Sequence, residues 1–301
     1  MKDFDTFLNM MHDCRFPVGI GGCKNNKHNF DCCEYNITIF NNCNHDFDHA
    51  MKLGDDTIIK IHYGNIKEAR SNILILYNRM KIINDPNWDL KIFLSKLHQN
   101  INNVSQDFIK NCLINSFIYS TKTKICIERH DPLSVLWQKC SVLFLLDALL
   151  IINSGKLSPT HILKYVRDFQ HNKINSHFSI INDCIGIERA TTSLLSRMYK
   201  STLCLNTKLQ KKDSKIIQTK YNYMIKNSLL SDCYLYLMYI NRNYLIEMKN
   251  KIHSNNVDIY YMLKNGFDID NDKIELHTRI KLVQNTADYL LREISNSGNF
   301  L

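Results

Sequence analysis

The sequence predicts an α+β fold, in which a small mixed sheet near the N-terminus is followed by a helical bundle. Short β-branched runs separated by turn signals occupy residues 16–83. After residue 88, apolar residues recur at the three- and four-residue spacing of helices. A chain of 301 residues is long enough for two domains, and we expect them at 1–86 and 87–301.

The first region is expected to contain a leading helix at 3–11 and five strands. β-Branched and aromatic side chains favour the extended conformation in each run. Asn78 and Arg79 are expected to form a tight hairpin between the last two strands. The strands are expected at 17–21, 35–40, 57–63, 72–77 and 80–83.

The second region is expected to be helical throughout. Pro86 suits the start of a helix that runs to Leu97. Asp131 and Pro132 are suited to the cap and first position of a later helix, which is apolar on nearly every side and should lie in the centre of the bundle. The other helices are expected at 106–127, 159–169, 187–204, 214–249, 256–265 and 272–296.

The composition excludes collagen-like, low-complexity and disordered classes, because the chain has only 9 Gly and 4 Pro. Lys and Arg number 38 against 29 Asp and Glu, a formal charge of +9, which favours anionic partners. Charges balance over residues 1–83, so the positive excess lies in the helical part. Phosphate attraction is therefore expected from that part, at a cleft between the domains.

Cysteine usage and hydropathy indicate a soluble cytoplasmic protein. The start of the chain lacks the apolar core of a secretory signal, and the apolar run at 142–152 is short and interrupted by Asp147, so we expect no membrane span. Eleven cysteines, an odd number, argue against a complete disulfide framework. Buried reduced thiols are the simpler interpretation.

One stretch carries a functional motif. An apolar strand ends at Gly21 and Gly22, Cys23 follows, and a second strand begins near Glu34 and Asn36. Glycines allow backbone amides to approach phosphates closely. Residues two apart in a strand share a face, so Glu34 and Asn36 point together. Oxygen ligands in this arrangement suit Mg²⁺.

These residues resemble the nucleotidyltransferase superfamily, which includes DNA polymerase β and the aminoglycoside nucleotidyltransferases. In that family an apolar strand ends in Gly-Ser or Gly-Gly, and a later strand carries Asp-x-Asp. Gly22-Cys23 and Glu34-x-Asn36 take these places. The match covers roughly the first ninety residues by motif and the rest by architecture alone, and the chain is also similar to an uncharacterised archaeal branch of the superfamily.

The resemblance implies a definite activity and cofactor. A nucleoside monophosphate would pass from a nucleoside triphosphate to a hydroxyl acceptor. Gly21, Gly22 and Cys23 would cradle the phosphates, and Glu34, with Asn36 as a weaker helper, would hold Mg²⁺.

Three departures from the family pattern indicate a degenerate site. Cys23 replaces a hydroxyl residue, and Asn36 replaces a carboxylate. The strand expected to supply a third carboxylate offers Lys60 and His62 instead. The alternative is therefore a non-catalytic protein that keeps the fold and binds RNA or an acidic partner. A protein-binding helical scaffold is a third hypothesis, which requires a large exposed apolar surface.

Other residues allow a functional and a structural interpretation. Asp147 should be buried, where it would either pair with a cation or act as a general base. Arg189 and Arg197, expected on one helix, would contact phosphates or only solvent. A basic run near Tyr221 and Tyr223 is typical of nucleic-acid binding when its residues share a surface. The lysines of this run are Lys208, Lys211, Lys212, Lys215 and Lys220.

The N-terminal cysteines and histidines include the residue types that bind zinc. No C-x-x-C pair is present, so buried thiols are the preferred interpretation. The adjacent Cys32 and Cys33 are not both expected to face the core from a strand. The candidate ligands are Cys14, Cys23, Cys32, Cys33, Cys43, His12, His28, His45 and His49.

Overall fold

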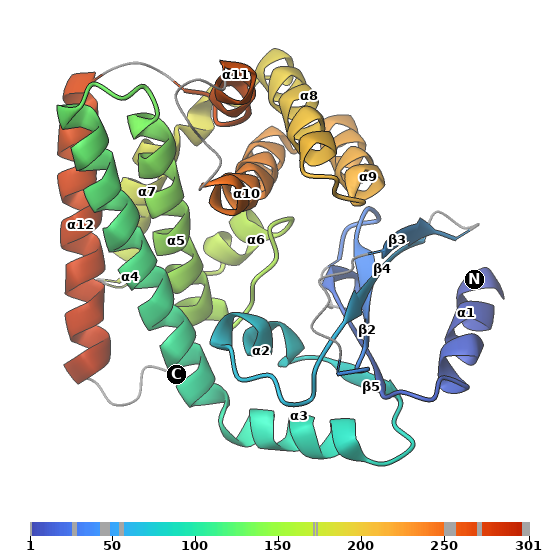
Figure 1. Cartoon of the computed structure of the whole chain (residues 1–301). Coiled ribbons are helices and arrows are strands. Elements are labelled where there is room, and N and C mark those ends of the chain that lie inside the picture. The colour runs from blue at the N-terminus through green and yellow to red at the C-terminus, as the bar shows by residue number, and fades with distance from the viewer. Residues whose placement is uncertain are drawn as a thin grey trace. The chain divides into compact units, whose positions relative to one another are not determined.

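The computed structural model (Figure 1) describes residues 2–25, 29–42, 49–53, 57–170, 172, 174–249, 257–269 and 273–296. The chain divides into two compact units. Unit 1 comprises Met1–Ser105 and Lys211–Tyr223, and unit 2 comprises Gln106–Gln210 and Met224–Leu301. Unit 1 thus takes in more of the chain than the predicted domain 1–86, including a segment from far along the sequence.

Unit 1 is built on a five-stranded sheet in the order β3-β4-β2-β1-β5. The pairing of β2 with β4 is parallel and the other pairings are antiparallel, so the predicted mixed sheet is confirmed. The elements are α1 (Lys2–His12), β1 (Val18–Gly21), the 3₁₀ helix η1 (Cys23–Asn25), β2 (Glu34–Ile39), β3 (His49–Lys52), β4 (Ile58–Tyr63), α2 (Ser71–Tyr77), β5 (Lys81–Asn84) and α3 (Asp89–Gln99).

Two apolar clusters pack on this sheet. Val18, Ile37 and Ile59 form one of them with Phe7 of α1. Phe40 anchors the other, together with residues of α2 and α3. Because side chains alternate between the faces of a strand, the polar residues of β2 and β4 lie on the face opposite α1.

Two predictions about unit 1 are wrong. Residues 72–77 form most of α2 rather than a strand, and Asn78 and Arg79 therefore make no hairpin. The buried residues of α2 are the consecutive Leu74 and Ile75, which a half-buried strand would place on opposite faces. Strand β3 was not predicted, because its four residues, His49–Lys52, are too few and too polar to give a strand pattern.

Unit 2 is helical, and α5 is its central helix as predicted, in contact with α6, α7, α10 and α12. Its elements continue from α4 (Ile101–Glu128), which begins in unit 1, through α5 (Ser134–Ser154), α6 (Ile162–Arg167), η2 (Asn175–His177), α7 (Phe178–Ile185), η3 (Ile187–Arg189), α8 (Thr192–Lys208), α10 (Leu230–Met248), α11 (Val257–Gly266) and α12 (Lys273–Asn296). Helix α9 (Ser214–Lys226) lies mostly in the later segment of unit 1.

Helix α5 is long and apolar enough to cross a membrane by composition alone. Most of its length is nevertheless buried inside the protein, including Leu143, Leu145 and Leu149. A buried core helix passes the same test of length and composition, so α5 is weak evidence for a membrane span.

Several predicted helices are divided differently in the structure. The helix predicted at 214–249 is two helices, α9 and α10, separated near Ser228, which has a positive φ of 56°. The helix predicted at 187–204 is broken at Ala190, because Thr191 caps α8 by accepting a hydrogen bond from the Leu194 amide at 3.3 Å. Helix α7 was not predicted.

Candidate functional site

The Gly21–Gly22 turn at the end of β1 brings the predicted site residues together in unit 1. Gly22 has a φ of +92°. A Cβ at this position would lie 2.8 Å from the backbone nitrogen of Asn36 and 2.8 Å from the backbone carbonyl oxygen of Glu34. Only glycine fits both the backbone angle and this close approach to β2. The turn places the Cys23 thiol 3.2 Å from Glu34 Oε2, to which it donates a hydrogen bond.

The sheet register fixes which polar residues share this face. Asn36 of β2 lies opposite Gly21 of β1 on one side and opposite Lys60 of β4 on the other. Glu34 lies two residues before Asn36, on the same face. The expected pairing of Glu34 and Asn36 on one face therefore follows from the strand, and the adjoining strand supplies Lys60 as predicted. Asp55 and Asp56, at the entrance to that strand, lie outside the described residues.

The partner of Glu34 was not predicted from the sequence. The Lys220 ammonium of α9 lies 2.7 Å from Glu34 Oε2, and both side chains are largely buried. Lys220 was placed in a basic nucleic-acid-binding run, but it falls between Ile216 and Met224 at helical spacing, on the buried face of α9. That spacing is the signal that would have identified it.

The two neighbours of Glu34 keep its carboxylate charged. Burial by itself would raise the pKa of Glu34, but the Lys220 ammonium and the hydrogen bond from Cys23 together hold that pKa below its ordinary value. The result is a buried ion pair at the position where the family resemblance places a metal-bound carboxylate.

These residues do not fit a pair of Mg²⁺ ions. Glu34 is neutralised by Lys220, Asn36 brings no charge, and Lys60 is a cation on the strand that would supply a third carboxylate. Asn36 Oδ1 is buried without a hydrogen-bond partner, so one neutral oxygen ligand is available. A hard dication requires several anionic or carbonyl oxygens, and two dications require more.

A group of buried thiols adjoins the ion pair. The Sγ atoms of Cys23 and Cys33 lie within 4.8 Å of each other. The Phe30 amide donates to Cys33 Sγ at 3.3 Å. The contact with the Cys23 side chain lowers the pKa of Cys33, whereas burial raises the pKa of Cys32 to about 12.

Cys32 and Cys33 are both buried, in agreement with the preferred interpretation of buried thiols, and they lie in the turn before β2 rather than in the strand. Two residues with zinc-type ligand atoms, Cys23 and Cys33, thus come together within unit 1. The candidate ligands His28, Cys43 and His45 lie outside the described residues, as does the side chain of His49.

In unit 2, Asp147 is buried as predicted and has a structural partner. Its carboxylate forms an ion pair with the Arg242 guanidinium at 2.6 Å and accepts a hydrogen bond from the Tyr239 hydroxyl. The guanidinium lies between the rings of Phe144 and Tyr239, at 4.8 Å and 4.3 Å from their centroids. Burial raises the pKa of Asp147, and Arg242 opposes that change. Of the two roles expected for Asp147, the structure shows the pairing with a cation.

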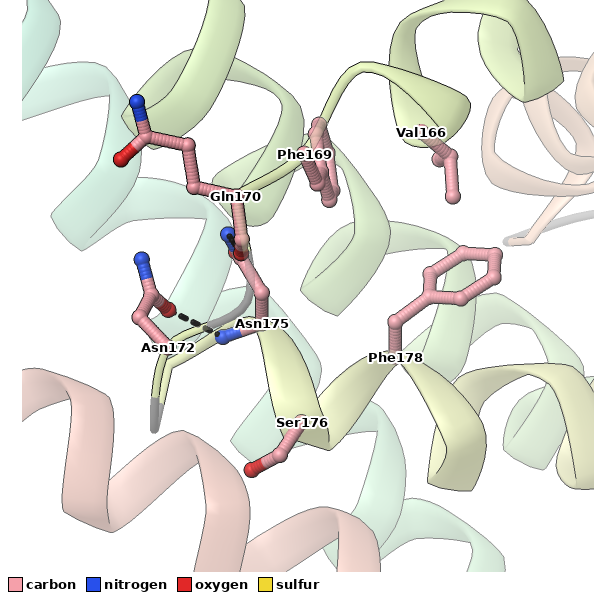
Figure 2. Close-up of a pocket in the computed structure, with 7 residues that line it drawn as sticks. All are labelled: Val166, Phe169, Gln170, Asn172, Asn175, Ser176 and Phe178. Carbon is pink, nitrogen blue, oxygen red and sulfur yellow. Dashed lines mark hydrogen bonds between the residues drawn. The ribbon is translucent and has the colours of Figure 1, made fainter.

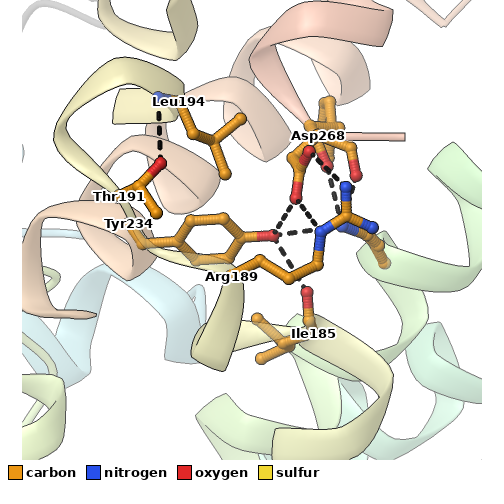
Figure 3. Close-up of polar contacts among 8 residues, drawn as sticks. Ile185, Arg189, Thr191, Leu194, Tyr234 and Asp268 are labelled. Atoms are coloured by element: carbon orange, nitrogen blue, oxygen red, sulfur yellow. Dashed lines mark hydrogen bonds and ion pairs between the residues drawn. The ribbon is translucent and has the colours of Figure 1, made fainter. Parts of the chain in front are cut away.

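The predicted phosphate ligand Arg189 also has a protein partner (Figure 3). Its Nε and Nη2 lie 3.1 Å from the two carboxylate oxygens of Asp268. Tyr234 donates to the same carboxylate at 3.2 Å and to the Ile185 carbonyl at 3.0 Å. Arg189 belongs to η3, so it does not share a helix with Arg197, which is exposed on α8. The prediction that the two arginines lie on one helix is therefore wrong.

Unit 2 also has an open hollow of about 530 Å³ in the loop between α6 and α7 (Figure 2). Phe169 and Phe178 form its apolar wall, with their ring centroids 6.5 Å apart. Asn175 is held in place by hydrogen bonds to Asn153 Oδ1 and to the Gln170 carbonyl. No sequence pattern had pointed to this loop.

Comparisons with protein-family models, with curated proteins and with solved structures find no match for this chain.

Proposed function

We propose that the chain is a non-catalytic RNA-binding protein that retains a nucleotidyltransferase-like sheet. The observation that carries this proposal is the Glu34–Lys220 ion pair, at the position that the family resemblance gives to a metal ligand. With Lys60 opposite Asn36, this face has more positive than negative charge. A surface of that sign attracts phosphates rather than metal ions.

The lysines beside the sheet give the RNA a specific place to bind. In unit 1 the segment 211–223 carries four lysines and one aspartate. Lys211, Lys212 and Lys215 are exposed, while Lys220 is buried. Lys215 lines a shallow hollow together with Lys52 of β3. Basic side chains grouped on one surface are the electrostatic pattern that nucleic-acid backbones recognise.

The same segment also contributes to an aromatic pair. Phe30 and Tyr223 are stacked with their ring centroids 5.7 Å apart, and each is partly exposed. Single-stranded RNA binds by combining backbone contacts to lysines with base stacking on aromatic side chains. We therefore expect single-stranded RNA rather than duplex to be the ligand.

Fluorescence anisotropy with a labelled single-stranded oligoribonucleotide, repeated over a range of salt concentrations, tests the proposal. Removing one lysine that neutralises a phosphate should reduce the slope of log K against log salt by about 0.7. Replacing Lys211, Lys212 and Lys215 together by Ala should therefore lower the slope by about 2. The matched control replaces Lys67, Lys81 and Lys96, exposed lysines of the same unit, and should leave the slope unchanged.

The competing enzymatic hypothesis is supported by the Gly21–Gly22 turn and by the shared face of Glu34 and Asn36. It requires binding of ATP or GTP in the presence of Mg²⁺, which isothermal titration calorimetry measures. Millimolar nucleotide that produces no binding heat would exclude the enzyme. Nucleotide binding that depends on Mg²⁺ and is lost in Glu34→Gln would instead contradict the non-catalytic proposal.

One observation favours protein binding as a second candidate function. Helix α4 carries four large apolar side chains that are about half exposed, Ile114, Phe117, Ile118 and Ile125. Except for Phe117, these residues follow one another along a single stripe of the helix. Such a stripe is the exposed apolar surface that a helical scaffold requires.

A further inference from the structure

We propose that Cys23 and Cys33 form a reversible disulfide bond, making the Gly22 turn a redox-sensitive element. The two Sγ atoms already lie within 4.8 Å of each other in the thiol state, and both side chains are buried. The S–S bond is about 2.05 Å long, so rotation of the two side chains has to bring the sulfurs together. This inference is independent of RNA binding.

The backbone around the two cysteines is held by other contacts. Cys23 begins η1, which directly follows the Gly22 turn against β2. Cys33 is held by the Phe30 amide, which donates to its sulfur, and by its own amide, which donates to the Phe30 carbonyl at 3.0 Å. The thiols are thus presented by two turns that pack against the same strand.

Hydrogen peroxide is a suitable two-electron oxidant for this pair. One cysteine sulfur attacks a peroxide oxygen, the O–O bond breaks, and the displaced hydroxide takes up the thiol proton as water. This cysteine becomes a sulfenic acid. The second sulfur attacks it, the S–O bond breaks, the S–S bond forms, and a second water leaves. Two thiols are oxidised and one peroxide is reduced to two waters.

The disulfide would alter the neighbouring ion pair. Cys23 donates its only thiol proton to Glu34 Oε2 at 3.2 Å, and it loses this proton on oxidation. Glu34 would then retain Lys220 as its partner at this oxygen, without the thiol. Oxidation would also tie the Gly22 turn covalently to the residue before β2. The contacts of Glu34 therefore depend on the redox state of the two thiols.

The test treats the folded full-length chain with hydrogen peroxide, alkylates remaining thiols under denaturing conditions, and maps tryptic peptides by mass spectrometry. Cys23 and Cys33 fall in different tryptic peptides, since Lys24 and Lys27 lie between them. We expect a cross-linked peptide pair two hydrogens lighter than the sum of its parts, and we expect dithiothreitol to separate it. Fragmentation should place the linkage at Cys33.

Two variants make the assignment specific. Cys33→Ser should abolish the cross-link, whereas Cys32→Ser, which removes the adjacent buried thiol, should leave it intact. The wild-type peptide map decides the question even if a variant fails to fold. Linkage of Cys23 to Cys32 or Cys43, or oxidation confined to the exposed Cys204, would overturn the proposal.

Discussion

The two units contain comparable buried ion pairs in different surroundings. In unit 1, Glu34 pairs with Lys220 on a polar sheet face, beside a thiol, Asn36 and a glycine turn. In unit 2, Asp147 of the apolar central helix α5 pairs with Arg242 among aromatic rings. Both carboxylates were candidate catalytic residues. The two ion pairs differ in the side chains that surround them.

The surroundings of each pair indicate its role. The Arg242 guanidinium continues a stack of rings in which Phe144 lies 5.5 Å from Tyr119 and Tyr119 lies 5.7 Å from Trp137. Such a pair serves packing, since its neighbours are mainly aromatic side chains. The surroundings of the Glu34 pair, by contrast, bring together ionisable and nucleophilic groups. A buried carboxylate is therefore informative about function only when other reactive groups share its site.

The largest expected effect is the loss of Asp147. Asp147→Ala leaves the Arg242 guanidinium buried without its carboxylate, and arginine cannot discharge by losing a proton. We expect the free energy of unfolding of unit 2 to fall by about 4 kcal/mol. Trp137 fluorescence during urea unfolding, in a Trp88→Phe background, reports on this unit.

The matched control for that variant is Asp183→Ala, which removes an exposed carboxylate of α7. It should change the free energy of unfolding by less than about 0.5 kcal/mol. Equal effects for Asp147→Ala and Asp183→Ala would contradict a structural role for the Asp147–Arg242 pair.

A smaller effect is expected for Glu34, because lysine can give up its charge when its partner is removed. Glu34→Ala should destabilise unit 1 by about 2 kcal/mol. The paired change Glu34→Gln with Lys220→Met removes both charges and should restore most of this loss. Amide hydrogen exchange in β1 and β2 measures the stability of this unit separately from that of unit 2.

RNA affinity should be unchanged in the Glu34→Gln, Lys220→Met protein, because the proposed contacts use other lysines. If the paired change is as destabilising as Glu34→Ala alone, uncompensated charge is not the cause. The comparison between the two units would then rest on packing rather than on the ion pairs.

Local patterns in the sequence predicted much of the fold. The Gly21–Gly22 turn, β2, β4 and the central helix each have a short-range signal, and so did the burial of Asp147. Residues 72–77 were predicted to form a strand but form a helix, because short apolar runs fit either structure. Propensity could not decide between them, and packing against α3 did.

The contacts of the candidate site residues were not predictable in the same way. Glu34 meets Lys220, and Arg189 meets Asp268, across long separations in sequence. A single sequence indicates which residues are buried, but it does not indicate which buried charges meet. The turn formed by Gly21, Gly22 and Cys23 lies at the end of the first strand, as predicted, because its geometry depends only on neighbours in two adjacent strands.

Substitution of Gly22 is expected to reduce stability by about as much as Glu34→Ala, or slightly less. In Gly22→Ala the new Cβ would clash with β2 at a positive φ, so we expect a loss of about 2 kcal/mol. Gly21→Ala is the matched control, because a Cβ there would meet no atom within 4 Å. Thermal unfolding followed by circular dichroism measures both variants, and equal losses would show that the turn does not require glycine at 22.

The smallest effect is the pH dependence that distinguishes the two carboxylates. The pKa of Glu34 is held below its ordinary 4.5, so its contribution to stability is present above that pH and is lost as pH falls through the lower, folded-state pKa. The pKa of Asp147 is raised above its ordinary 3.8, so the contribution of its titration to stability becomes more favourable as pH falls.

Urea unfolding of wild type, Glu34→Gln and Asp147→Asn between pH 3 and 6 distinguishes the contributions of the two carboxylates. The difference between wild type and Glu34→Gln should shrink on acidification, whereas that between wild type and Asp147→Asn should not. Parallel pH trends for both variants would mean that the carboxylates share one kind of environment, and the contrast between a functional and a structural ion pair would fail.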